Sequence, residues 1–557
     1  MTNSIQNAQV PNSIKVAAAF VKAKKLLESR GTILKDYQVK GVKWMLDKEI
    51  NSDYRGGLLC DDPGLGKTIQ TIGLMAGNPV AKTLIIVPTS LVDQWEKEIN
   101  KYFPDKQIYK HYGNRKAINL LELFANPYDI CISTYGNIFT KEKSGDKHTV
   151  LHKVKWDRII LDEAHIIKDK STTTHIMCKD IQAKHHWGLS GTPVQNDVAD
   201  IKNLFSFVGI HKELLDECLE EVIDNYVLRR NKTVLTNGIV PKLQEENDIE
   251  PGATPVADED FVGDVAVLKD YIIQQHFVPF DTEEEQLLYS RIYNHALHEY
   301  YEAVDAAVAE GNGRQIQLVV LELLIRLRQL SVHPTIALEN INKKHELDIK
   351  FEKISTKINK VISLVKEANG QCLVFCQFRK EMEYIKKYLA EQQIDSDIYD
   401  GSLSLDQRKL LLEKHTPKSS IVRVDGKIKI VKKTVPKVLI VQIKAGGVGL
   451  NLQQFRNVII CSPDWNPCNE IQAIARAHRL GQKEEVKVHK VCLVANKQFV
   501  KNKRDIISTI DERIHTIQKE KRTLMSNLLK DQTLLGNEKA IGTRLNADDF
   551  KHLLLGN

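Results

Sequence analysis

Short apolar runs separated by polar, helix-like stretches mark two regions of the chain, residues 31–215 and 351–505. Continuous apolar runs that alternate with helical stretches are typical of buried parallel strands connected by helices. The pattern therefore predicts an α/β protein with two parallel-sheet lobes. The clearest runs lie at residues 84–87, 130–133 and 159–161 in the first lobe and at residues 372–375, 438–441, 458–461 and 486–493 in the second.

Helical patterns flank and separate the two lobes. Residues 14–30 have the pattern of a basic amphipathic helix that follows Ser13 as its N-cap. Thr282 and Glu285 have the spacing of a capping box, which predicts one helix to residue 310 and a second to residue 326. The predicted organisation is an N-terminal extension (1–30), a first lobe (31–215), helical protrusions and a linker (216–350), a second lobe (351–505) and a helical C-terminal segment (506–557).

Composition is that of an ordinary soluble globular protein, with 557 residues, 42% apolar and 27% charged. The net charge of +7 is small for this length, so any surface for nucleic acid must be local. The nine cysteines form no Cys-x-x-Cys pair, which argues against a zinc site and predicts reduced, mostly buried thiols of an intracellular protein. No apolar run approaches membrane-spanning length, and a mitochondrial presequence is the alternative for residues 14–30.

Residues 61–68, Asp-Asp-Pro-Gly-Leu-Gly-Lys-Thr, follow an apolar run and precede a helical stretch. This order of strand, glycine loop and helix is that of a P-loop, in which backbone N–H groups face the phosphates of a nucleotide. Lys67 would reach the β- and γ-phosphates, and Thr68 would ligate Mg²⁺. Asp61 stands at the first glycine position of the pattern GxxxxGK[ST], so a glycine turn before a helix is the alternative.

Asp162 and Glu163 come directly after the apolar run at residues 159–161. They are therefore expected at the carboxyl end of a strand, where ligands bind in open α/β sheets. Asp162 is a candidate Mg²⁺ ligand, and Glu163 is a candidate to orient the attacking water or accept its proton. An isolated Asp-Glu pair is more often a solvated strand end, but after a P-loop it indicates a nucleoside triphosphatase.

Arg476 and Arg479 lie in a stretch with a helical pattern, residues 472–482. We expect the two arginines one helical turn apart, so that both point the same way. Two guanidinium groups on one face suit the negative charge that develops on a transferring phosphoryl group, which is the role of an arginine finger. An exposed basic helix face is the alternative.

Together these segments resemble helicase superfamily 2, and within it the Swi/Snf family of DNA-dependent ATPases. Gln38 lies in a segment similar to the family's adenine-recognising Q motif. Two departures are Asp62-Pro63, where Glu-Met is usual, and Ala475, where an acidic residue is usual. Further segments similar to family motifs are residues 85–91 with 94–95 (motif Ia), 133–135 (Ib), 189–196 (III), 228–230 with 240–242, 327–329 with 333–334, 374–378 (IV), 400–402 with 408, and 444–452 (V).

The resemblance implies two RecA-like lobes that bind ATP and Mg²⁺ between them, and a C-terminal helix that braces the second lobe. It implies an ATP-dependent translocase on double-stranded DNA that remodels protein–DNA complexes in chromatin, repair or transcription. A strand-separating DNA helicase and a DNA-binding scaffold with weak ATPase activity are the alternatives. Residues 545–550 resemble the Rad-type repair and transcription-termination branch, although the RING finger often inserted in that branch is missing.

The resemblance implies double-stranded DNA as a partner, together with nucleosomes or transcription and repair proteins. It implies no association with a membrane, and a monomeric protein. The implied location is the nucleus, or the viral or cytoplasmic compartment in which a large DNA virus replicates its DNA.

The implied site residues form three sets. The catalytic set is Lys67, Glu163, Arg476 and Arg479. The nucleotide-binding set, in which Thr68 and Asp162 also hold the metal, is Gln38, Asp61, Asp62, Pro63, Gly64, Leu65, Gly66, Lys67, Thr68 and Asp162. The DNA-binding set is Pro88, Thr89, Ser90, Thr134, Tyr135, Gln377, Phe378, Lys444, Ala445, Gly446 and Gly447.

A basic insertion at residues 418–437 is not explained by the resemblance, and its net charge is +6. Asp425 and Gly426 stand between two apolar and basic runs, which is a strong signal for a two-residue β-hairpin. One interpretation is a solvated hairpin whose lysines prevent edge-to-edge pairing. The other is a hairpin that adds non-specific contacts to DNA phosphates.

Overall fold

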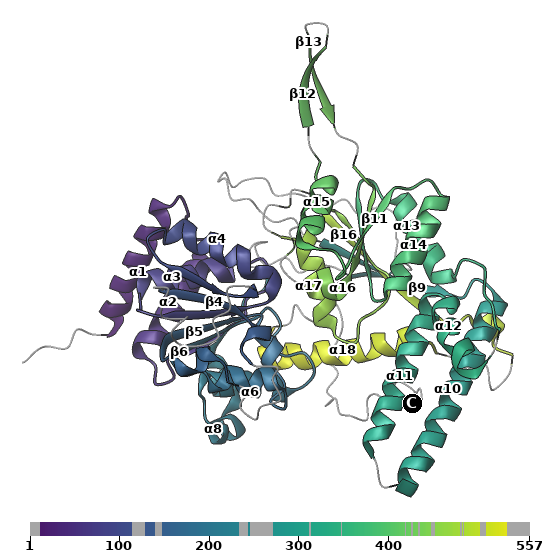
Figure 1. Ribbon diagram of the computed structural model, residues 1–557, viewed down its shortest axis with the longest axis horizontal. Helices are drawn as coiled ribbons and strands as arrows, with labels where there is room; N and C mark the ends of the chain where they lie inside the picture. The colour runs from purple at the N-terminus through teal and green to yellow at the C-terminus, as the bar shows by residue number, and fades with distance from the viewer. Residues whose placement is uncertain are drawn as a thin grey trace, which may run out of the picture. The chain divides into compact units, whose positions relative to one another are not determined.

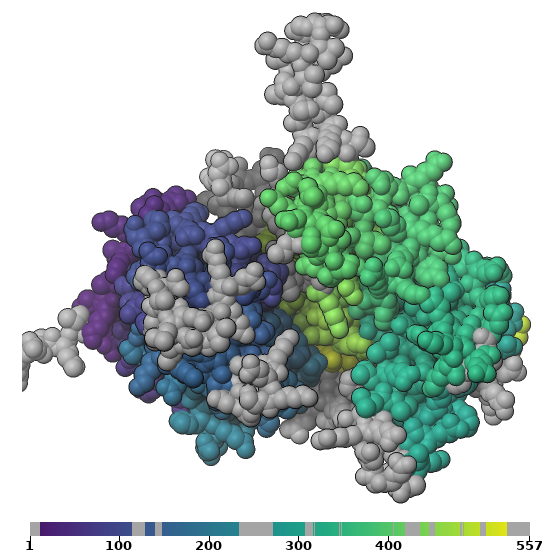
Figure 2. All heavy atoms as spheres, in the orientation of Figure 1, coloured from purple at the N-terminus to yellow at the C-terminus, as the bar shows by residue number. Residues whose placement is uncertain are grey.

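The computed structural model consists of two compact units (Figure 1), the first formed by residues up to 234 together with Leu528–Asp531 and the second by the rest of the chain. Figure 2 shows the same molecule as spheres, with the first unit purple to blue and the second mostly teal to yellow. The structure describes residues 12–113, 129–139, 148–232, 243–245, 271–310, 313–346, 348–417, 419–424, 427–432, 435–446, 450, 452–479, 482, 484–501 and 508–531.

A seven-stranded parallel sheet forms the centre of the first unit, with the strand order β3-β4-β2-β5-β6-β1-β7. The inner strands are buried on both faces, which explains their continuous apolar sequences. The strands are β1 (Gly56–Leu59), β2 (Thr83–Val87), β3 (Ile108–His111), β4 (Ile130–Thr134), β5 (Trp156–Asp162), β6 (Ala183–Leu189) and β7 (Val227–Leu228). The predicted strands at residues 84–87, 130–133 and 159–161 are confirmed.

Helices surround this sheet, and the N-terminal helix α1 (Asn12–Ser29) packs against α2 (Asp36–Asn51) and α3 (Lys67–Gly77). The helix predicted at residues 14–30 is therefore present and buries Phe20, Ala23 and Leu27. The other helices among the described residues of the unit are α4 (Val92–Tyr102), α6 (Thr173–Asp180), α7 (Val198–Val208), α8 (Lys212–Glu217) and α9 (Leu219–Tyr226), with the short 3₁₀ turns η1 (Thr89–Leu91), η3 (Tyr135–Asn137), η4 (Val150–Lys153) and η5 (Ala164–Ile167).

A buried ion pair joins helix α2 to the middle of this sheet. The guanidinium of Arg158 donates to both carboxylate oxygens of Glu49, each at 2.6 Å, and the indole N–H of Trp187 donates to the same carboxylate at 2.8 Å. The side-chain amide of Asn78 donates to it as well, at 2.7 Å, and these four donors satisfy the buried charge and fix the position of α2 on the sheet.

The second unit also contains a seven-stranded parallel sheet, with the strand order β11-β14-β10-β15-β16-β9-β8. Its strands are β8 (Leu243–Glu245), β9 (Tyr271–Pro279), β10 (Cys372–Cys376), β11 (Ser396–Tyr399), β14 (Val438–Gln442), β15 (Asn457–Ile460) and β16 (Val486–Val494). The four strands predicted for this lobe are confirmed. Strand β9 was not predicted, because it lies where the sequence indicated helices and a linker and carries three polar residues, Gln274, Gln275 and His276.

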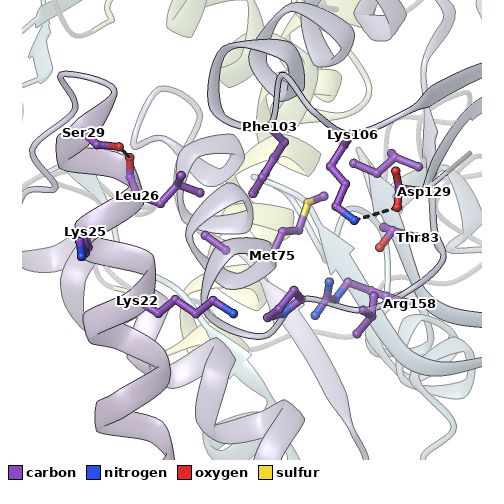
Figure 3. A pocket seen from close by; sticks show the side chains of 14 residues that line it. Lys22, Lys25, Leu26, Ser29, Met75, Thr83, Phe103, Lys106, Asp129 and Arg158 are labelled. Carbon is purple, nitrogen blue, oxygen red and sulfur yellow. Dashed lines mark hydrogen bonds and ion pairs between the residues drawn. The ribbon is translucent and has the colours of Figure 1, made fainter.

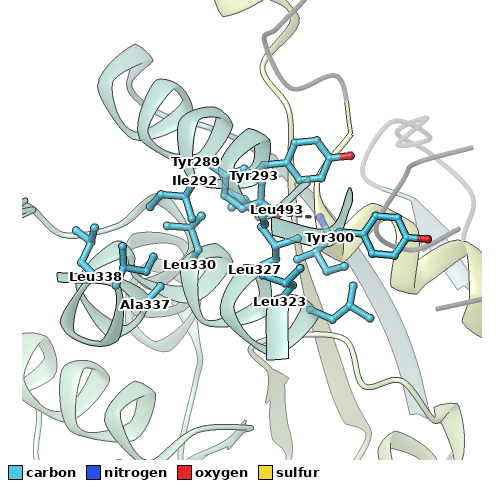
Figure 4. Packing of buried hydrophobic residues seen from close by; sticks show 14 of the residues in the cluster. Tyr289, Ile292, Tyr293, Tyr300, Leu323, Leu327, Leu330, Ala337, Leu338 and Leu493 are labelled. Carbon is cyan, nitrogen blue, oxygen red and sulfur yellow. Dashed lines mark hydrogen bonds between the residues drawn. The ribbon is translucent and has the colours of Figure 1, made fainter. Parts of the chain in front are cut away.

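Helices α10 (Glu283–Glu310), α11 (Gly313–Val332) and α12 (Pro334–His345) share one apolar core (Figure 4), which includes Tyr289, Leu327 and Leu338 and also Leu493 of β16. The two helices expected from residue 282 onward are thus present. Thr282 accepts the backbone N–H of Glu285 at 3.3 Å, as a capping box requires. The Glu285 carboxylate, however, accepts from the backbone N–H and hydroxyl of Thr356, at 3.1 and 2.6 Å.

In the described part of the second unit, the other helices are α13 (Thr356–Glu367), α14 (Arg379–Glu391), α15 (Leu405–His415), α16 (Ile443–Gly446), α17 (Pro467–Ala477) and α18 (Ile510–Leu529), with the 3₁₀ turn η7 (Lys497–Phe499). Near the start of α18, Asp511 accepts from Ser331 at 2.8 Å and from the backbone N–H of Leu493 at 3.0 Å, and it forms a buried ion pair with Lys357. Helix α18 is therefore anchored to the second unit at its N-terminal end. Among the described helices, none is both long and apolar enough to cross a membrane.

The hairpin predicted around Asp425 and Gly426 is confirmed by the pairing of its two strands, while these two turn residues lie outside the described residues. Strands β12 (Ser419–Val424) and β13 (Lys427–Lys432) pair antiparallel in a sheet of their own, with Val424 opposite Lys427.

All nine cysteines are free thiols and only Cys218 is not buried, as the sequence predicted. The domain boundaries given above stay a prediction.

Candidate nucleotide site and catalytic segments

The segment between β1 and α3 has the backbone conformation of a phosphate-binding loop. Gly64 and Gly66 have positive φ angles of 96° and 83°, which glycine adopts without strain. A Cβ atom on Gly66 would also lie 2.6 Å from the amide nitrogen of Gln38. Helix α3 begins directly after the loop, at Lys67, so its first N–H groups are available to an anion at the loop.

The two residues with the predicted phosphate and metal contacts are Lys67 and Thr68, in the first turn of α3. The Lys67 ammonium donates to the backbone carbonyl of Asp61 at 2.6 Å, so it lies over the loop. An ammonium has three donors, which leaves capacity for phosphate oxygens beside this bond. Both side chains are partly exposed, as residues that bind a soluble ligand must be.

The acidic residues of the loop are held by two adjacent arginines that follow β7. Arg230 donates through Nε to the fully buried carboxylate of Asp61 at 2.8 Å, and Gln70 donates to the same carboxylate at 2.9 Å. Arg229 donates to Asp62 at 3.0 Å. The Asp61 side chain is therefore committed to the protein, and the predicted contact of Asp61 with the nucleotide stays a prediction.

Gln38 connects helix α2 to the same loop. Its side-chain oxygen accepts the backbone N–H of Lys35 at 3.0 Å, and its amide nitrogen donates to the carbonyl of Leu65 at 3.1 Å. The resemblance to the Q motif assigns Gln38 to the adenine base, and this role stays a prediction. The geometry shows that Gln38 fixes the loop conformation.

Asp162 and Glu163 follow β5, as predicted. The Asp162 carboxylate accepts the indole N–H of Trp95 at 2.8 Å and the backbone N–H of Glu163 at 3.0 Å. Burial and the adjacent charge of Glu163 raise the pKa of Asp162, and the Trp95 hydrogen bond opposes this shift. A divalent cation beside Asp162 would supply the missing positive charge, so the donor set fits the predicted Mg²⁺.

Glu163 has a left-handed backbone, with φ 53° and ψ 49°, which is uncommon for a residue with a side chain. Such conformations concentrate at functional sites, where the surrounding structure holds them. Its carboxylate lies 3.4 Å from Nδ1 of His165, and the same nitrogen lies 3.2 Å from the hydroxyl of Ser190. Burial and the charge of Lys168 lower the pKa of His165 to about 4, so this histidine is neutral at pH 7 and takes part in hydrogen bonds only.

Motif III, residues 189–196, contacts the P-loop directly. A Cβ atom on Gly191 would lie 2.8 Å from the ring of Pro63, so only glycine allows the two segments to approach this closely. The guanidinium of Arg229 also donates to the carbonyl of Gly191 at 3.1 Å. Pro63, which departs from the family pattern, is thus accommodated by the glycine opposite it.

The strand register brings these segments to one edge of the first sheet. Leu59, the last residue of β1, and Asp162, the last residue of β5, both pair with Leu189 of the strand between them. The P-loop and the Asp162-Glu163 pair therefore leave the sheet at the same level, two strand spacings or roughly 10 Å apart.

The structure corrects the placement of the two arginines, which lie in the second unit. Helix α17 ends at Ala477, so it contains Arg476 but not Arg479, and the two are not one helical turn apart. His478 leaves the helical conformation and packs its buried ring against Tyr271, with 4.7 Å between the ring centroids. Burial lowers the pKa of Arg479, and the catalytic roles of both arginines stay predictions.

The residues that the resemblance assigns to DNA also lie at carboxyl ends of strands. In the first unit, Thr89 and Ser90 are exposed after β2, whereas Tyr135 is buried and donates its hydroxyl to the Asp162 carbonyl at 2.8 Å. In the second unit, Gln377 donates to Asp464 at 2.8 Å. The remaining members of this set are the partly buried Pro88 and buried Thr134, the partly buried Phe378 after β10, the exposed Lys444 with Ala445 and Gly446 in α16, and Gly447, which lies outside the described residues.

Sequence reasoning missed the residues that hold the site together. Arg229 and Arg230 were noted only as a family signature, and Trp95 and His165 had no assigned role. The available signal was an adjacent arginine pair in a chain whose P-loop carries two unusual carboxylates. Sequence alone does not reveal which distant residues make such contacts.

Two segments of the chain match models of known protein families. The SNF2-related domain matches residues 37–218, and the helicase conserved C-terminal domain matches residues 356–481. A solved structure of the Sulfolobus solfataricus SWI2/SNF2 ATPase core in complex with double-stranded DNA aligns with 90% of this chain and 94% of that chain, at 23% identity and a TM-score of 0.34.

Relatives are found in bacteria, viruses and eukaryotes. The chain is 28% identical over 536 residues to a putative ATP-dependent helicase/translocase, YwqA, of Bacillus subtilis, covering 90% of this chain and 49% of that protein. It is 27% identical over 529 residues to a probable global transactivator of Orgyia pseudotsugata multicapsid polyhedrosis virus, covering 91% of this chain and 93% of that protein. It is 26% identical to the TATA-binding protein-associated factor MOT1 of Saccharomyces cerevisiae, covering 90% of this chain and 28% of that protein. The chain thus spans about half of the bacterial relative and nearly all of the viral one.

Proposed function

We propose that this chain, which belongs to the Snf2 family of helicase superfamily 2, hydrolyses ATP in response to double-stranded DNA and uses the energy to move along the duplex. The observation that carries the proposal is the sheet register that places the P-loop and the Asp162-Glu163 pair at one edge, flanking Leu189. A phosphate-binding loop beside two carboxylates is the constellation required for phosphoryl transfer to water.

Each residue of this edge has a defined task in hydrolysis. Lys67 and the first N–H groups of α3 bind and orient the phosphates of ATP. Thr68 and Asp162 would hold Mg²⁺, which neutralises phosphate charge when bound. Glu163, whose side chain is partly exposed, orients the attacking water and takes its proton.

The second unit supplies Arg476 and Arg479, whose guanidinium groups stabilise the negative charge of the transferring phosphoryl group. Because they belong to a different unit from the P-loop, hydrolysis depends on closure of the two units. Repeated closure moves the DNA-contacting segments of the units along phosphates in turn, so movement is independent of base sequence.

The relatives support a role on DNA inside larger processes. Their names include a putative helicase/translocase, a TATA-binding protein-associated factor and the human DNA excision repair protein ERCC-6. For this chain we infer the same class of task, the remodelling of protein–DNA complexes in chromatin, repair or transcription. It would act as a monomer in the nucleus or in a viral compartment of DNA replication.

Parallel measurements of ATP turnover test this function. Turnover is measured with no nucleic acid, double-stranded DNA, single-stranded DNA and RNA, and we expect strong stimulation by the duplex. The Arg479→Ala variant should lose this stimulation while its DNA affinity stays nearly unchanged. A triplex strand should be displaced while a forked duplex stays paired.

Three results would contradict the proposal. Robust unwinding of the forked duplex would indicate a strand-separating helicase. Unstimulated turnover together with tight DNA binding would indicate a scaffold, and stimulation by RNA alone would indicate a different substrate.

A further inference from the structure

Helix α1 and the amino ends of strands β2, β4 and β5 line a partly open cavity of about 450 Å³ (Figure 3). Thr83 and Ile130 are the first residues of β2 and β4, and Arg158 lies near the start of β5. The cavity is therefore at the opposite edge of the sheet from the P-loop. Its volume is within the range typical of small-molecule sites.

Apolar side chains form most of the cavity wall. Leu26 of α1, Met75 of α3 and Phe103 after α4 point towards the cavity in Figure 3. Ala76, Pro79, Val80 and Ile130 complete this apolar lining. An occupant must therefore have an apolar body that replaces water along these walls.

Most polar side chains at the cavity are already satisfied within the protein. Lys106 is paired with Asp129 at 2.7 Å, and Arg158 is paired with Glu49. The Ser29 hydroxyl donates to the carbonyl of Leu26 at 2.8 Å. These groups are poorly suited to bind a charged occupant, because a new contact with the occupant would require breaking an existing hydrogen bond or ion pair.

Two cations at the cavity remain available. Lys22 and Lys25 are exposed, lie three residues apart on α1, and make no hydrogen bond or ion pair with any described residue. Residues at this spacing project from the same side of a helix. Helix α1 thus places two ammonium groups beside an apolar cavity.

We propose that this cavity binds a small amphipathic anion, with its apolar body against Leu26, Met75 and Phe103 and its single carboxylate or phosphate group beside Lys22 and Lys25. Because the cavity combines an apolar wall with two available cations, it favours a ligand that has an apolar body and a separate anionic group. Neither a nucleotide nor an uncharged apolar molecule meets both conditions.

The site is separate from the nucleotide site but physically connected to it. Helix α3 begins at Lys67 in the P-loop, and its residues Met75 and Ala76 line the cavity eight and nine residues later, about 12 Å along the helix. Helix α1 lies before residue 37, where the match to the SNF2-related domain begins. The cavity is therefore completed by a helix outside the matched domain.

Binding of decanoate tests the proposal on the full chain without any measurement of ATP turnover. Calorimetric titration should show one decanoate per chain, and decyl phosphate should bind the same site. The double variant Lys22→Glu/Lys25→Glu should bind decanoate about tenfold more weakly but bind decanol, which has no charge, as the unmodified protein does. The matched control Lys15→Glu/Lys24→Glu makes the same charge change on the same helix away from the cavity and should leave decanoate affinity unchanged.

A second variant tests the apolar wall. Leu26→Trp fills the cavity and should abolish binding of both decanoate and decanol, while binding of ATP shows that the variant is folded. The proposal is overturned if the unmodified protein does not bind decanoate, or if the two charge-reversal variants bind it equally. Retained decanoate binding in folded Leu26→Trp would also overturn it.

Discussion

The guanidinium of Arg230 contacts the fully buried carboxylate of Asp61 in the P-loop, with Nε 2.8 Å from Oδ1, although 169 residues separate the two in sequence. The same carboxylate also accepts from Gln70 at 2.9 Å. A buried carboxylate is tolerated only when it is paired and hydrogen-bonded. The conformation of this P-loop therefore depends on Arg230, a residue that is distant from the loop in sequence.

Arg230→Ala should destabilise the first unit by about 3–5 kcal/mol, because it leaves the Asp61 charge buried and unpaired. ATP affinity should fall as well, since the loop loses its anchor. Thermal unfolding and titration with a fluorescent ATP analogue measure the two effects. The double variant Asp61→Gly/Arg230→Ala removes both charges and should recover most of the lost stability.

A matched control for this prediction is Lys184→Ala. Lys184 forms an ion pair with Asp157 at 2.7 Å in the same unit, but its side chain is 69% exposed. Exposed pairs contribute less than about 1 kcal/mol, so this variant should unfold close to the temperature of the unmodified protein. Equal losses in the two single variants would show that the Arg230–Asp61 pair has no special role.

Local sequence patterns predicted the elements that carry the site. The strand ending at Asp162 and the loop before Lys67 follow from short-range signals, because burial on both faces requires continuous apolar runs and a P-loop requires glycines. The hairpin around Asp425 and Gly426 followed from its turn residues in the same way.

Features that depend on distant contacts were missed. Helix α17 was expected to continue through Arg479, but it ends where His478 packs against Tyr271, which precedes it by more than 200 residues. Strand β9, which contains Tyr271, was missed because its polar residues conceal its full pairing with β16. Neither partner can be identified from the local sequence, since packing in three dimensions selects it.

Glu163→Gln should keep the binding of ATP and Mg²⁺ but reduce turnover by orders of magnitude. The substitution preserves shape and hydrogen bonding at this position but removes the group that takes the proton of the attacking water. Nucleotide binding and phosphate release are measured on the same preparation. Lys67→Ala serves as the contrast, because it should weaken ATP binding as well as turnover. Turnover at the unmodified rate in Glu163→Gln would exclude Glu163 from the mechanism.

Replacement of the hairpin should separate the two interpretations of residues 418–437. If the hairpin contacts DNA, a Gly-Ser linker in its place should weaken DNA binding and flatten its salt dependence, with each lost phosphate contact reducing the log-log slope by roughly 0.9. ATP affinity should hardly change. A linker of equal length that keeps the basic residues tests whether charge alone suffices. An unchanged salt slope in the Gly-Ser variant would identify the hairpin as a solvated surface element.

Glu285 should make the stability of the second unit dependent on pH. Burial, aided by the charge of Asp281, raises the pKa of Glu285 from 4.5 to about 7, although Thr356 donates two hydrogen bonds to its carboxylate. The folded protein therefore binds this proton more tightly than the unfolded chain does. The free energy of unfolding should fall as pH rises from 4.5 to about 7. Above that range the ionised Glu285 carboxylate destabilises the folded protein by its full amount.

Glu285→Gln removes this titration and keeps an oxygen that can accept from Thr356. Relative to the unmodified protein, the variant should gain stability as pH rises, by up to about 3 kcal/mol at pH 8, because one pKa unit corresponds to about 1.4 kcal/mol. The difference in unfolding temperature between the two proteins, measured from pH 5 to 8, gives this gain. Glu284→Gln is the matched control, since Glu284 is the preceding residue of α10, its side chain is 61% exposed, and it pairs only at the surface with Lys353. The difference in unfolding temperature between Glu285→Gln and the unmodified protein could instead be constant with pH, or equal to the difference for Glu284→Gln. Either result would show that the pKa of Glu285 is not raised from 4.5 to about 7 by folding.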